Sequence, residues 1–287
     1  MSETVGALLD ALAMRLAGPG EPPARAEARE LIAAVLDAPR HWPTAHRAER
    51  VPAETQARIE AAAARRAEGM PLQYAVGYAP FRHLTLQVDR RVLIPRPETE
   101  SLVDLVLERT DGGRGVAVDV GTGSGAIALA LAAEGAFEVV HAIDLSSDAL
   151  AVAQANLAAI PAGRRDRMRW HQGDLLAPVR DISVDVVVSN PPYISPSEMP
   201  ALPALVRDWE PTMALVAPDD GMALIRALVP QAAERLVGGG WVMMEVDSRR
   251  ADLAAAAVRD DGRFTSVEIR PDLTGRPRFV VARRQET

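Results

Sequence analysis

The strongest constraint on the fold is an alternation of helical and β-type segments that begins near residue 101 and continues to the end of the chain. Runs rich in valine and isoleucine are separated by stretches in which apolar residues recur at helical spacing. This alternation indicates parallel strands joined by crossover helices, a doubly wound α/β sheet. The expected strands lie near 116–120, 139–143, 168–171, 185–190, 240–246, 264–270 and 277–282. The expected helices lie near 101–109, 125–134, 147–158, 221–236 and 249–259.

The first hundred residues divide into two parts of different character. Residues 1–70 predict a small helical bundle, because apolar residues recur at helical spacing on both sides of a Gly18-Pro19-Gly20 break. An alanine-rich third helix is expected from Glu54 to Glu68. Residues after 70 predict a short β-hairpin that leads into the run from Pro95 to Glu100. We therefore expect a helical substrate-recognition domain at 1–70, a hairpin and linker at 71–100, and an α/β domain at 101–287.

Composition excludes several classes of function. The formal net charge of −7 argues against a duplex-DNA binder that uses a broad basic surface. The chain has no cysteine, which excludes disulfides, thiolate metal sites and cysteine nucleophiles, and its five histidines lack metal-ligand spacing, so no metal is expected. No apolar run approaches the roughly 20 residues of a membrane span, and the N-terminus does not resemble a secretory signal. A cytoplasmic location is expected.

A glycine-rich loop follows the first strand of the α/β part and predicts a cofactor site. After the strand at 116–120, the chain continues as Gly121-Thr122-Gly123-Ser124-Gly125 and then into a helix. Glycines allow the backbone to approach a ligand closely, and the start of the helix presents unpaired N–H groups. The spacing is G-x-G-x-G and not the G-x-G-x-x-G of dinucleotide phosphate loops. Asp119, just before the loop, suits a ligand that carries an ammonium or sulfonium, although it can also cap loop amides.

Acidic residues mark the ends of the next two strands. Asp144 ends the strand near 139–143, where a carboxylate can accept hydrogen bonds from both hydroxyls of a ribose. Asp148 is better explained as a helix N-terminal residue favoured by the helix dipole. Asp174 follows the third strand and can accept from an adenine amino group, although helix capping explains it almost as well. A glycine loop, a ribose acid and an adenine acid in this order are more specific than any one of them.

The tetrad Asn190-Pro191-Pro192-Tyr193 follows a run of buried valines at the end of a predicted strand. An amide, two rigid prolines and an aromatic ring at such an edge form a small pocket for a planar group that contains nitrogen. The alternative is structural, because Asn-Pro-Pro also terminates strands well. The tetrad therefore indicates chemistry on an amide or amine nitrogen next to the predicted cofactor site.

The region from about 115 to 193 resembles class I S-adenosylmethionine-dependent methyltransferases, and the tetrad matches those that methylate amino or amide nitrogens. A fuller pattern resembles one family, the release-factor glutamine methyltransferases (PrmC or HemK), over nearly the whole chain. The segments that carry this resemblance are Gln73-Tyr74, Phe81, Leu93 to Glu100, Glu210-Pro211, Ala214-Leu215 and Gly275 to Arg278. The resemblance implies a mostly parallel, seven-stranded Rossmann-like sheet with an N-terminal helical bundle and a connecting β-hairpin.

The resemblance also implies the reaction. The methyl donor would be S-adenosylmethionine, which becomes S-adenosylhomocysteine, and the substrate would be the glutamine of the Gly-Gly-Gln loop in bacterial peptide chain release factors. The Asn190 side-chain oxygen and the Pro191 carbonyl would accept hydrogen bonds from the amide N–H groups. Tyr193 would form a flat wall, and Pro192 would stiffen the loop. The cofactor would contact Asp119, residues 121–125, Asp144, Asp174, Leu175 and Asn190.

Two segments depart from the family pattern, and one residue is ambiguous. Leu175 stands where the family often has an aromatic residue, so adenine stacking is expected to be weaker. The segment from Glu245 to Arg250 lacks the usual glycine and glutamine. Arg96 either shapes the entrance to the substrate site or forms a salt bridge with Glu98 or Glu100.

Several alternatives stay open. An adenine-N6 or other amino methyltransferase acting on nucleic acid would suit the tetrad, but it needs a base-flipping surface that the acidic balance does not favour. A small-molecule N-methyltransferase is a weaker rival, as is a cofactor-binding module that has lost catalysis. The loop spacing disfavours a nicotinamide oxidoreductase. We expect a monomer whose partners are release factors, with no stable nucleic-acid or membrane partner.

Overall fold

The computed structural model describes residues 3–17 and 24–286. The expected break at Gly18-Pro19-Gly20 lies outside the described residues. The chain forms two compact units, one made of Met1–Tyr78 with Ala204–Trp209 and the other of Ala79–Pro203 with Glu210–Thr287. Each unit has its own hydrophobic core, so each is described separately.

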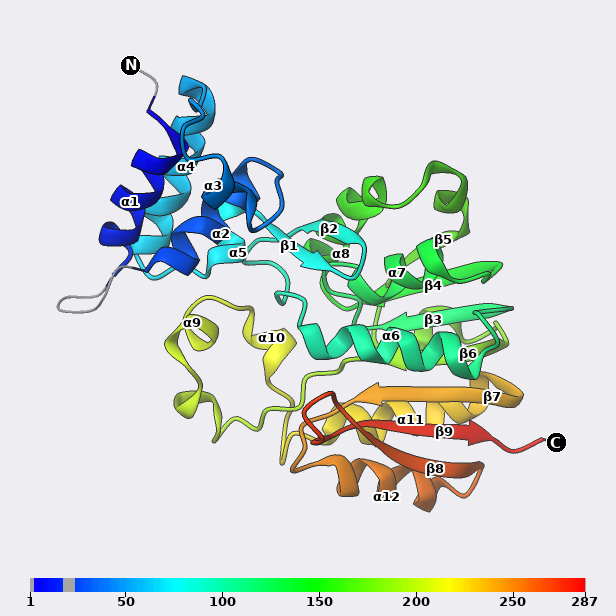
Figure 1. The fold of residues 1–287 in the computed structure, drawn as a ribbon. Coiled ribbons are helices and arrows are strands. Elements are labelled where there is room, and N and C mark those ends of the chain that lie inside the picture. The colour runs from blue at the N-terminus through cyan, green and yellow to red at the C-terminus, as the bar shows by residue number, and fades with distance from the viewer. Residues whose placement is uncertain (1–2, 18–23, 287) are drawn as a thin grey trace. The chain divides into compact units, whose positions relative to one another are not determined.

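The first unit is a bundle of short helices (Figure 1). Its core contains Leu8, Leu12, Leu31, Ile32 and Ile59, which recur at helical spacing and are fully or almost fully buried. The first helix begins where the Thr4 hydroxyl accepts a hydrogen bond from the amide of Ala7 at 3.2 Å. The helices are α1 (Val5–Arg15), α2 (Arg25–Val35), α3 (Trp42–Ala45), α4 (Ala53–Ala67), α5 (Leu72–Val76) and, from the later segment, α9 (Ala204–Arg207).

The second unit is built on a seven-stranded sheet with the order β5-β4-β3-β6-β7-β9-β8. The five strands from β5 to β7 are parallel to one another, and β9 is antiparallel to both of its neighbours. The doubly wound, mostly parallel sheet expected from the sequence is therefore confirmed. The strands are β3 (Val116–Val120), β4 (Val139–Asp144), β5 (Met168–Gln172), β6 (Val184–Ser189), β7 (Leu236–Glu245), β8 (Phe264–Pro271) and β9 (Pro277–Arg284).

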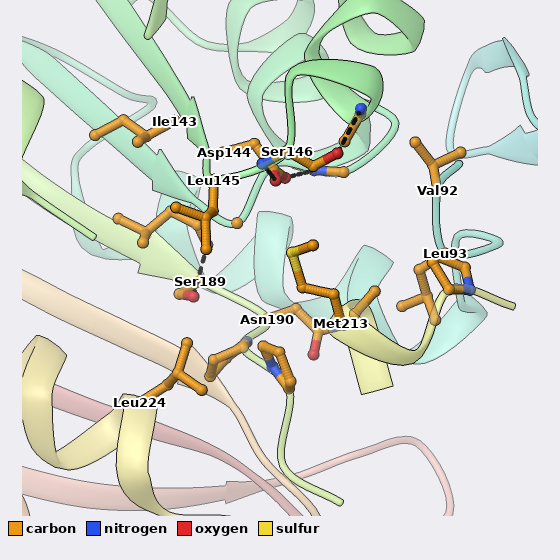
Figure 2. A pocket seen from close by; sticks show the side chains of 18 of the residues that line it. Val92, Leu93, Ile143, Asp144, Leu145, Ser146, Ser189, Asn190, Met213 and Leu224 are labelled. Atoms are coloured by element: carbon orange, nitrogen blue, oxygen red, sulfur yellow. Dashed lines mark hydrogen bonds between the residues drawn. The ribbon is translucent and has the colours of Figure 1, made fainter. Parts of the chain in front are cut away.

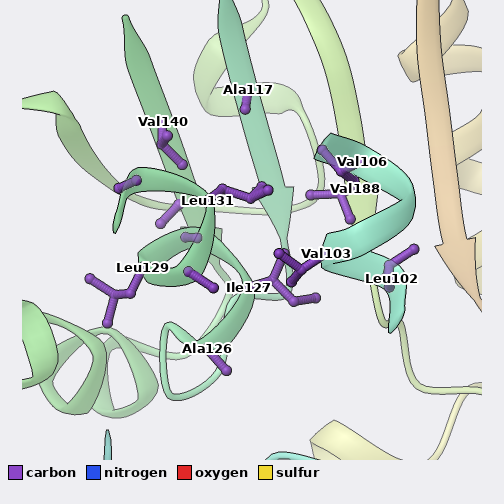
Figure 3. Packing of buried hydrophobic residues seen from close by; sticks show 14 of the residues in the cluster. Leu102, Val103, Val106, Ala117, Ala126, Ile127, Leu129, Leu131, Val140 and Val188 are labelled. Atoms are coloured by element: carbon purple, nitrogen blue, oxygen red, sulfur yellow. The ribbon is translucent and has the colours of Figure 1, made fainter. Parts of the chain in front are cut away.

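Helices cover both faces of this sheet. Strand residues alternate between two cores. Ala117 and Val188 belong to the core under α6 and α7 (Figure 3), whereas Val118 and Val187 belong to the core under α11 and α12. The strands are apolar on both faces because both are buried. The helices are α6 (Pro97–Arg109), α7 (Ala126–Glu134), α8 (Ser147–Ala155), α10 (Thr212–Leu215), α11 (Ala223–Arg235) and α12 (Ala251–Asp261). Short 3₁₀ turns lie at Asn156–Ala159, Ala162–Arg167, Ala177–Val179 and Met199–Ala201.

A two-stranded hairpin of β1 (Tyr78–Phe81) and β2 (Leu84–Gln87) precedes α6. The side chain of Asn156 fixes it to the sheet domain. The amide nitrogen of Asn156 donates to the carbonyls of Gln87 and Ser124, both at 2.9 Å, and its oxygen accepts from the amide of Gln87 at 2.7 Å. Asn156 is 2% exposed, so these bonds satisfy a buried polar group and connect the hairpin to the glycine-rich loop.

The strand order fixes where a ligand can bind. The chain moves outward from β3 to β4 and β5, then returns to place β6 on the other side of β3. In open α/β sheets, this reversal leaves a crevice at the carboxyl ends of the central strands. The glycine loop, Asp144, Asp174 and Asn190 all follow these ends. No helix in the described part of the chain is both long enough and apolar enough to cross a membrane.

Candidate active site

A pocket lies at the carboxyl ends of β3, β4, β5 and β6, entirely within the second unit. Figure 2 shows Asp144 and Ser146 on one side of this pocket, with Ser189 and Asn190 on the opposite side. The pocket brings together the residues that the sequence predicted at three strand ends. The predicted residues that line it are Gly121, Gly123, Asp144, Asp174, Leu175, Asn190, Pro191 and Pro192.

The glycine loop has one face open to this pocket. Gly121 and Gly123 have φ values of 74° and 56°, and a Cβ atom on either would meet no other atom within 4 Å. Glycine is therefore required here by the backbone conformation and not by crowding. The amides of Gly121 and Thr122 both donate to the carbonyl of Ile143 at 2.9 Å, so the end of β4 holds the loop. The result is an open backbone cradle beside Asp144.

Asp119 lies beneath the loop and does not line the pocket. One carboxylate oxygen accepts from the hydroxyl of Thr122 at 2.6 Å and from the amide of Ala128 at 3.2 Å. The other oxygen, Oδ1, has no hydrogen-bond partner among the residues that the structure describes. Burial raises the pKa of Asp119 to about 7. The residue therefore holds the loop and the start of α7 from below, and its second oxygen is buried away from the pocket.

Asp144 faces the pocket directly. Its Oδ2 accepts from the amide of Gly123 at 2.8 Å, and its Oδ1 accepts from the amide of Ser146 at 2.9 Å. Each carboxylate oxygen has a second lone pair, so both can still accept from a diol. Burial raises the pKa of Asp144. Asp148 lies in the first turn of α8, which agrees with the helix-terminal explanation.

Leu175 has a backbone conformation that the sequence did not reveal. Its φ is 47°, in the left-handed region that side chains other than glycine rarely adopt, and it is 8% exposed on the pocket wall. Such a conformation costs on the order of 1 kcal/mol and persists only where neighbours enforce it. The amide of Leu176 donates to the side chain of Gln231 at 3.1 Å, and the amide of Ala177 donates to the carbonyl of Asp174 at 3.0 Å. These bonds hold the segment against the pocket.

The Asn190 side chain is oriented by two residues from other elements. Its Nδ2 donates to the hydroxyl of Thr99 at 3.2 Å, and that hydroxyl donates to Oε2 of Glu245 at 2.7 Å. Thr99 lies on α6 and Glu245 ends β7, and they are 4% and 1% exposed. Tyr193 does not line the pocket, and burial raises the pKa of its hydroxyl to about 12, so the phenol stays protonated.

The loop after the tetrad is held by charged residues. Although burial opposes it, hydrogen bonds from Ser195 and Arg250 lower the pKa of Glu198 to about 2. Arg250 binds Glu198 and also donates to the carbonyl of Asp220 at 2.8 Å. Arg249 reaches the same glutamate at 2.8 Å. The segment at 245–250, which departs from the family pattern, thus supplies the two arginines that hold this loop.

Gly221 packs against the backbone of the tetrad, and this contact gives a testable prediction. A Cβ atom on Gly221 would lie 2.1 Å from the carbonyl oxygen of Tyr193 and 2.7 Å from the Arg250 side chain. Gly221→Ala must therefore displace Tyr193, and we expect it to lower methyl-transfer turnover at least about 10-fold, since small misplacements at a reacting centre are costly. Gly262→Ala is the matched control, because Gly262 has a similar φ of 76° with no atom within 4 Å of its Cβ position. Equal turnover in the two variants would contradict the prediction.

Arg96 pairs with Glu210, so one of its two alternative explanations, a salt bridge with Glu98 or Glu100, was wrong. Arg96 Nη2 lies 2.6 Å from Oε1 of Glu210, whose side chain is 2% exposed. The other Glu210 oxygen accepts from the amide of Ile94 at 3.4 Å. Arg96 does not line the pocket. It instead holds the segment at 93–96 beside the segment at 210–214, and both contribute pocket walls.

Sequence reasoning missed the apolar walls of the pocket. Leu145 and Met213 are 56% and 57% exposed, although large apolar side chains are usually covered. Nothing in the local sequence marks them, because they are far apart in the sequence and line the same pocket only in the folded chain. The missed apolar lining residues include Leu93, Leu145, Met213 and Leu224 (Figure 2), and the polar Arg91 was missed as well.

The sheet order, the glycine loop after β3 and the acid after β4 define the class I methyltransferase fold. Solved structures share this fold. Ribosomal protein L11 methylase from Lactobacillus delbrueckii subsp. bulgaricus matches with a TM-score of 0.51 and 21% identity over 73% of this chain and 99% of that one. A methyltransferase from Pyrococcus furiosus matches with a TM-score of 0.53 and 16% identity over 82% of this chain and 100% of that one.

Comparisons of sequence identify a narrower group of proteins than the fold does. Residues 7–77 match the PrmC N-terminal domain, and residues 98–207 match the methyltransferase small domain. The release factor glutamine methyltransferase of Koribacter versatilis is 37% identical over 98% of this chain and 99% of its own length. The release factor glutamine methyltransferase of Deinococcus radiodurans is 39% identical over 96% of this chain and 97% of its own length. The chain belongs to the release factor glutamine methyltransferase family. It is an enzyme whose methyl donor is S-adenosylmethionine.

Proposed function

We propose that this enzyme methylates the side-chain amide nitrogen, N5, of the glutamine in the Gly-Gly-Gln motif of bacterial peptide chain release factors. The observation that carries the proposal is the orientation of Asn190 at the pocket wall. Because its Nδ2 is bound to Thr99, its Oδ1 is the end left to accept a hydrogen bond from a substrate. A substrate that offers N–H donors, such as a primary amide, fits this acceptor.

The residues around the pocket suit S-adenosylmethionine. The open face of Gly121 and Gly123 would admit its methionine moiety, and Asp119 would contribute by holding this loop from below. Asp144 would accept from the ribose hydroxyls, and Asp174 and Leu175 would adjoin the adenine. When bound, the cofactor supplies an electrophilic methyl group on a sulfonium.

The tetrad would prepare a poor nucleophile. The lone pair of an amide nitrogen is delocalised into the carbonyl, so the nitrogen reacts only when it is oriented and when its developing positive charge is stabilised. The Asn190 oxygen and the Pro191 carbonyl would accept its two N–H groups, and Tyr193 and Pro192 would restrict its position. Overall, one amide hydrogen is replaced by methyl, with S-adenosylhomocysteine and a proton released.

The first unit would bind the release factor away from the reacting glutamine. Two observations support this role. Residues 7–77 match the N-terminal domain of this family, and none of the predicted catalytic residues lies in that range. Contacts far from the reacting group can supply binding energy for positioning. We propose the domain roles expected from the sequence: recognition by 1–70, connection by 71–100, and catalysis by 101–287.

We also propose a monomer that works in the cytoplasm without a stable nucleic-acid partner. The support is the net charge of −7, which disfavours binding to phosphate backbones, and the role of release factors in translation. A nucleic-acid amino methyltransferase would need basic surfaces for a flipped base.

An acceptor panel tests the proposed function. The full-length enzyme is incubated with methyl-labelled cofactor and, separately, a purified bacterial release factor, an adenine-containing oligonucleotide and transfer RNA. We expect label in the release factor at a rate at least about 100-fold above the other acceptors, because the release factor would also bind the first unit, whereas the net charge of −7 disfavours nucleic acid. A release factor whose Gly-Gly-Gln glutamine is replaced by glutamate is the matched control and should take no label. Preferential labelling of either nucleic acid would overturn the proposal.

A further inference from the structure

Three polar side chains form one hydrogen-bonded series behind the pocket wall. Asn190 Nδ2 donates to the Thr99 hydroxyl at 3.2 Å, and the hydroxyl donates to the Glu245 carboxylate at 2.7 Å. Thr99 and Glu245 are almost fully buried, at 4% and 1% exposure, and neither lines the pocket. A carboxyl group in such a position is costly to bury, so its presence needs a reason.

The series determines which end of the Asn190 amide faces the pocket. A threonine hydroxyl has one proton to donate, and an ionised carboxylate can only accept. Because the Thr99 hydroxyl donates its one hydrogen bond to Glu245, it can only accept a hydrogen bond from Asn190. The NH₂ end of Asn190 must therefore face Thr99. The Asn190 oxygen is then turned away from Thr99 and is free to accept.

We propose that Thr99 and Glu245 are positioning residues for the methyl acceptor: Thr99 fixes the rotation of the Asn190 amide, and the charge of Glu245 strengthens its oxygen as an acceptor. This inference rests on the proposed function, since it takes the substrate to present an N–H group to Asn190. The three hydrogen bonds, including the one to the substrate, point head to tail toward the carboxylate. Bonds arranged in this way polarise one another, most strongly where water is excluded.

The charge of Glu245 would act when positive charge develops on the substrate nitrogen. Fixed dipoles aimed at developing charge are worth more in a buried site than in water. The titratable groups around Glu245 are Arg278 and Arg96, which favour its charged form, Glu98, which opposes it, and Tyr193, whose phenol pKa is raised first by burial and then by the charge of Glu245. Burial outweighs the hydrogen bond from Thr99 and raises the pKa of Glu245 to about 7.

Protonation of Glu245 would undo this arrangement. A protonated carboxyl can donate to Thr99, which can then donate to the Asn190 oxygen and turn its NH₂ end toward the substrate. Two N–H groups would then face each other at the reacting nitrogen. Turnover should therefore fall as the pH drops through about 7.

The test combines NMR of the free enzyme with kinetics. In ¹⁵N-labelled wild-type protein without substrate, the Asn190 side-chain NH₂ signal should shift with a midpoint near pH 7, and the shift should vanish in Thr99→Val and Glu245→Gln. Turnover of the release factor is measured from pH 6 to 8.5 at saturating cofactor, because Asp119 also has a raised pKa near 7. We expect kcat about 10- to 100-fold lower in both variants, without the acid limb seen in wild type.

Two further variants serve as controls. Thr99→Ser keeps the hydroxyl and should retain the wild-type pH profile. Thr110→Val removes a hydroxyl at the far end of α6, where it donates to the carbonyl of Val106, and should leave kcat unchanged. Cofactor affinity should stay within about twofold in every variant, since none of the changed side chains lines the pocket.

The melting temperature supplies a further readout, because a variant that folds poorly would not become more stable than wild type. Because burial raises the folded-state pKa of Glu245 from its ordinary value of 4.5 to about 7, the fold loses stability as the pH rises between these two values, and the whole loss is present above pH 7. Glu245→Gln should therefore have a Tm above wild type at pH 8.5, and the two Tm values should converge only as the pH falls toward 4.5. Wild-type kcat and pH profile in Thr99→Val or Glu245→Gln would overturn the inference. If the Asn190 signal titrates as expected but the enzyme does not methylate release factors, the proposed function alone is refuted.

Discussion

Replacing Asn190 with alanine is expected to lower kcat for release-factor methylation by about 10²-fold or more, the scale of losing one preorganised polar contact at a reacting centre. The alanine removes the one side-chain acceptor that Thr99 orients at the pocket wall. The amide nitrogen would then lose a hydrogen bond that positions its lone pair and stabilises its charge. The measurement is single-turnover methyl transfer at saturating enzyme and cofactor, which separates the chemical step from binding.

Cofactor binding should survive the Asn190→Ala change. The glycine loop and Asp144 do not depend on Asn190 for any of their hydrogen bonds. Calorimetric titration with S-adenosylhomocysteine should therefore give a Kd within about threefold of wild type. Gln154→Ala, an exposed change on α8, serves as the control. Turnover within about threefold of wild type would remove Asn190 from the mechanism.

Replacing Asp144 with alanine is expected to weaken the binding of S-adenosylmethionine by about 10²-fold or more. The free lone pairs of its carboxylate can accept from two hydroxyls, and hydrogen bonds to charged groups contribute about 1.5–3 kcal/mol each. The same carboxylate accepts from the amides of Gly123 and Ser146, so its loss also loosens the cradle. The measurement is the Kd for the cofactor by calorimetry.

Asp148→Ala is the matched control for this loss. Asp148 lies four positions later on the same connection, exposed in the first turn of α8, and does not line the pocket; it acts through the helix dipole and through its charge near Arg91. Its removal should leave the Kd within about twofold. Thermal unfolding of both variants shows whether the fold survives. A Kd for Asp144→Ala as close to wild type as that of Asp148→Ala would exclude Asp144 as the ribose acceptor.

The sequence predicted the parts of the fold that depend on local pattern. Valine-rich runs such as 186–188 form buried strands, because each face of the sheet carries helices. The acids at 144 and 174 meet at one edge, because the carboxyl ends of parallel strands lie together. The order of the strands could not be read from the same pattern. The insertion of β9 between β7 and β8 depends on which edges the chain can reach, and local spacing does not encode that.

The side-chain partners in the site were not predictable, because they are far apart in sequence. Thr99 and Glu245 are separated by 146 residues and Arg96 and Glu210 by 114. No periodicity connects such pairs, and Arg96 has nearer acids in Glu98 and Glu100 that compete with Glu210 in any local argument. Leu175 shows the same limit, since the bonds that hold its segment run from the amide of Leu176 to Gln231 on α11 and from the amide of Ala177 to the carbonyl of Asp174.

The most direct test is to locate the transferred methyl group on the substrate. Full-length enzyme, S-adenosylmethionine and a purified bacterial release factor are incubated, and the release factor is digested and sequenced by tandem mass spectrometry. We predict one methyl group, carried on the side chain of the glutamine in Gly-Gly-Gln and absent when Asn190→Ala enzyme is used. A methyl group on another residue or on a backbone nitrogen, or an unmodified release factor alongside a methylated nucleic acid, would contradict a glutamine amide acceptor held by Asn190.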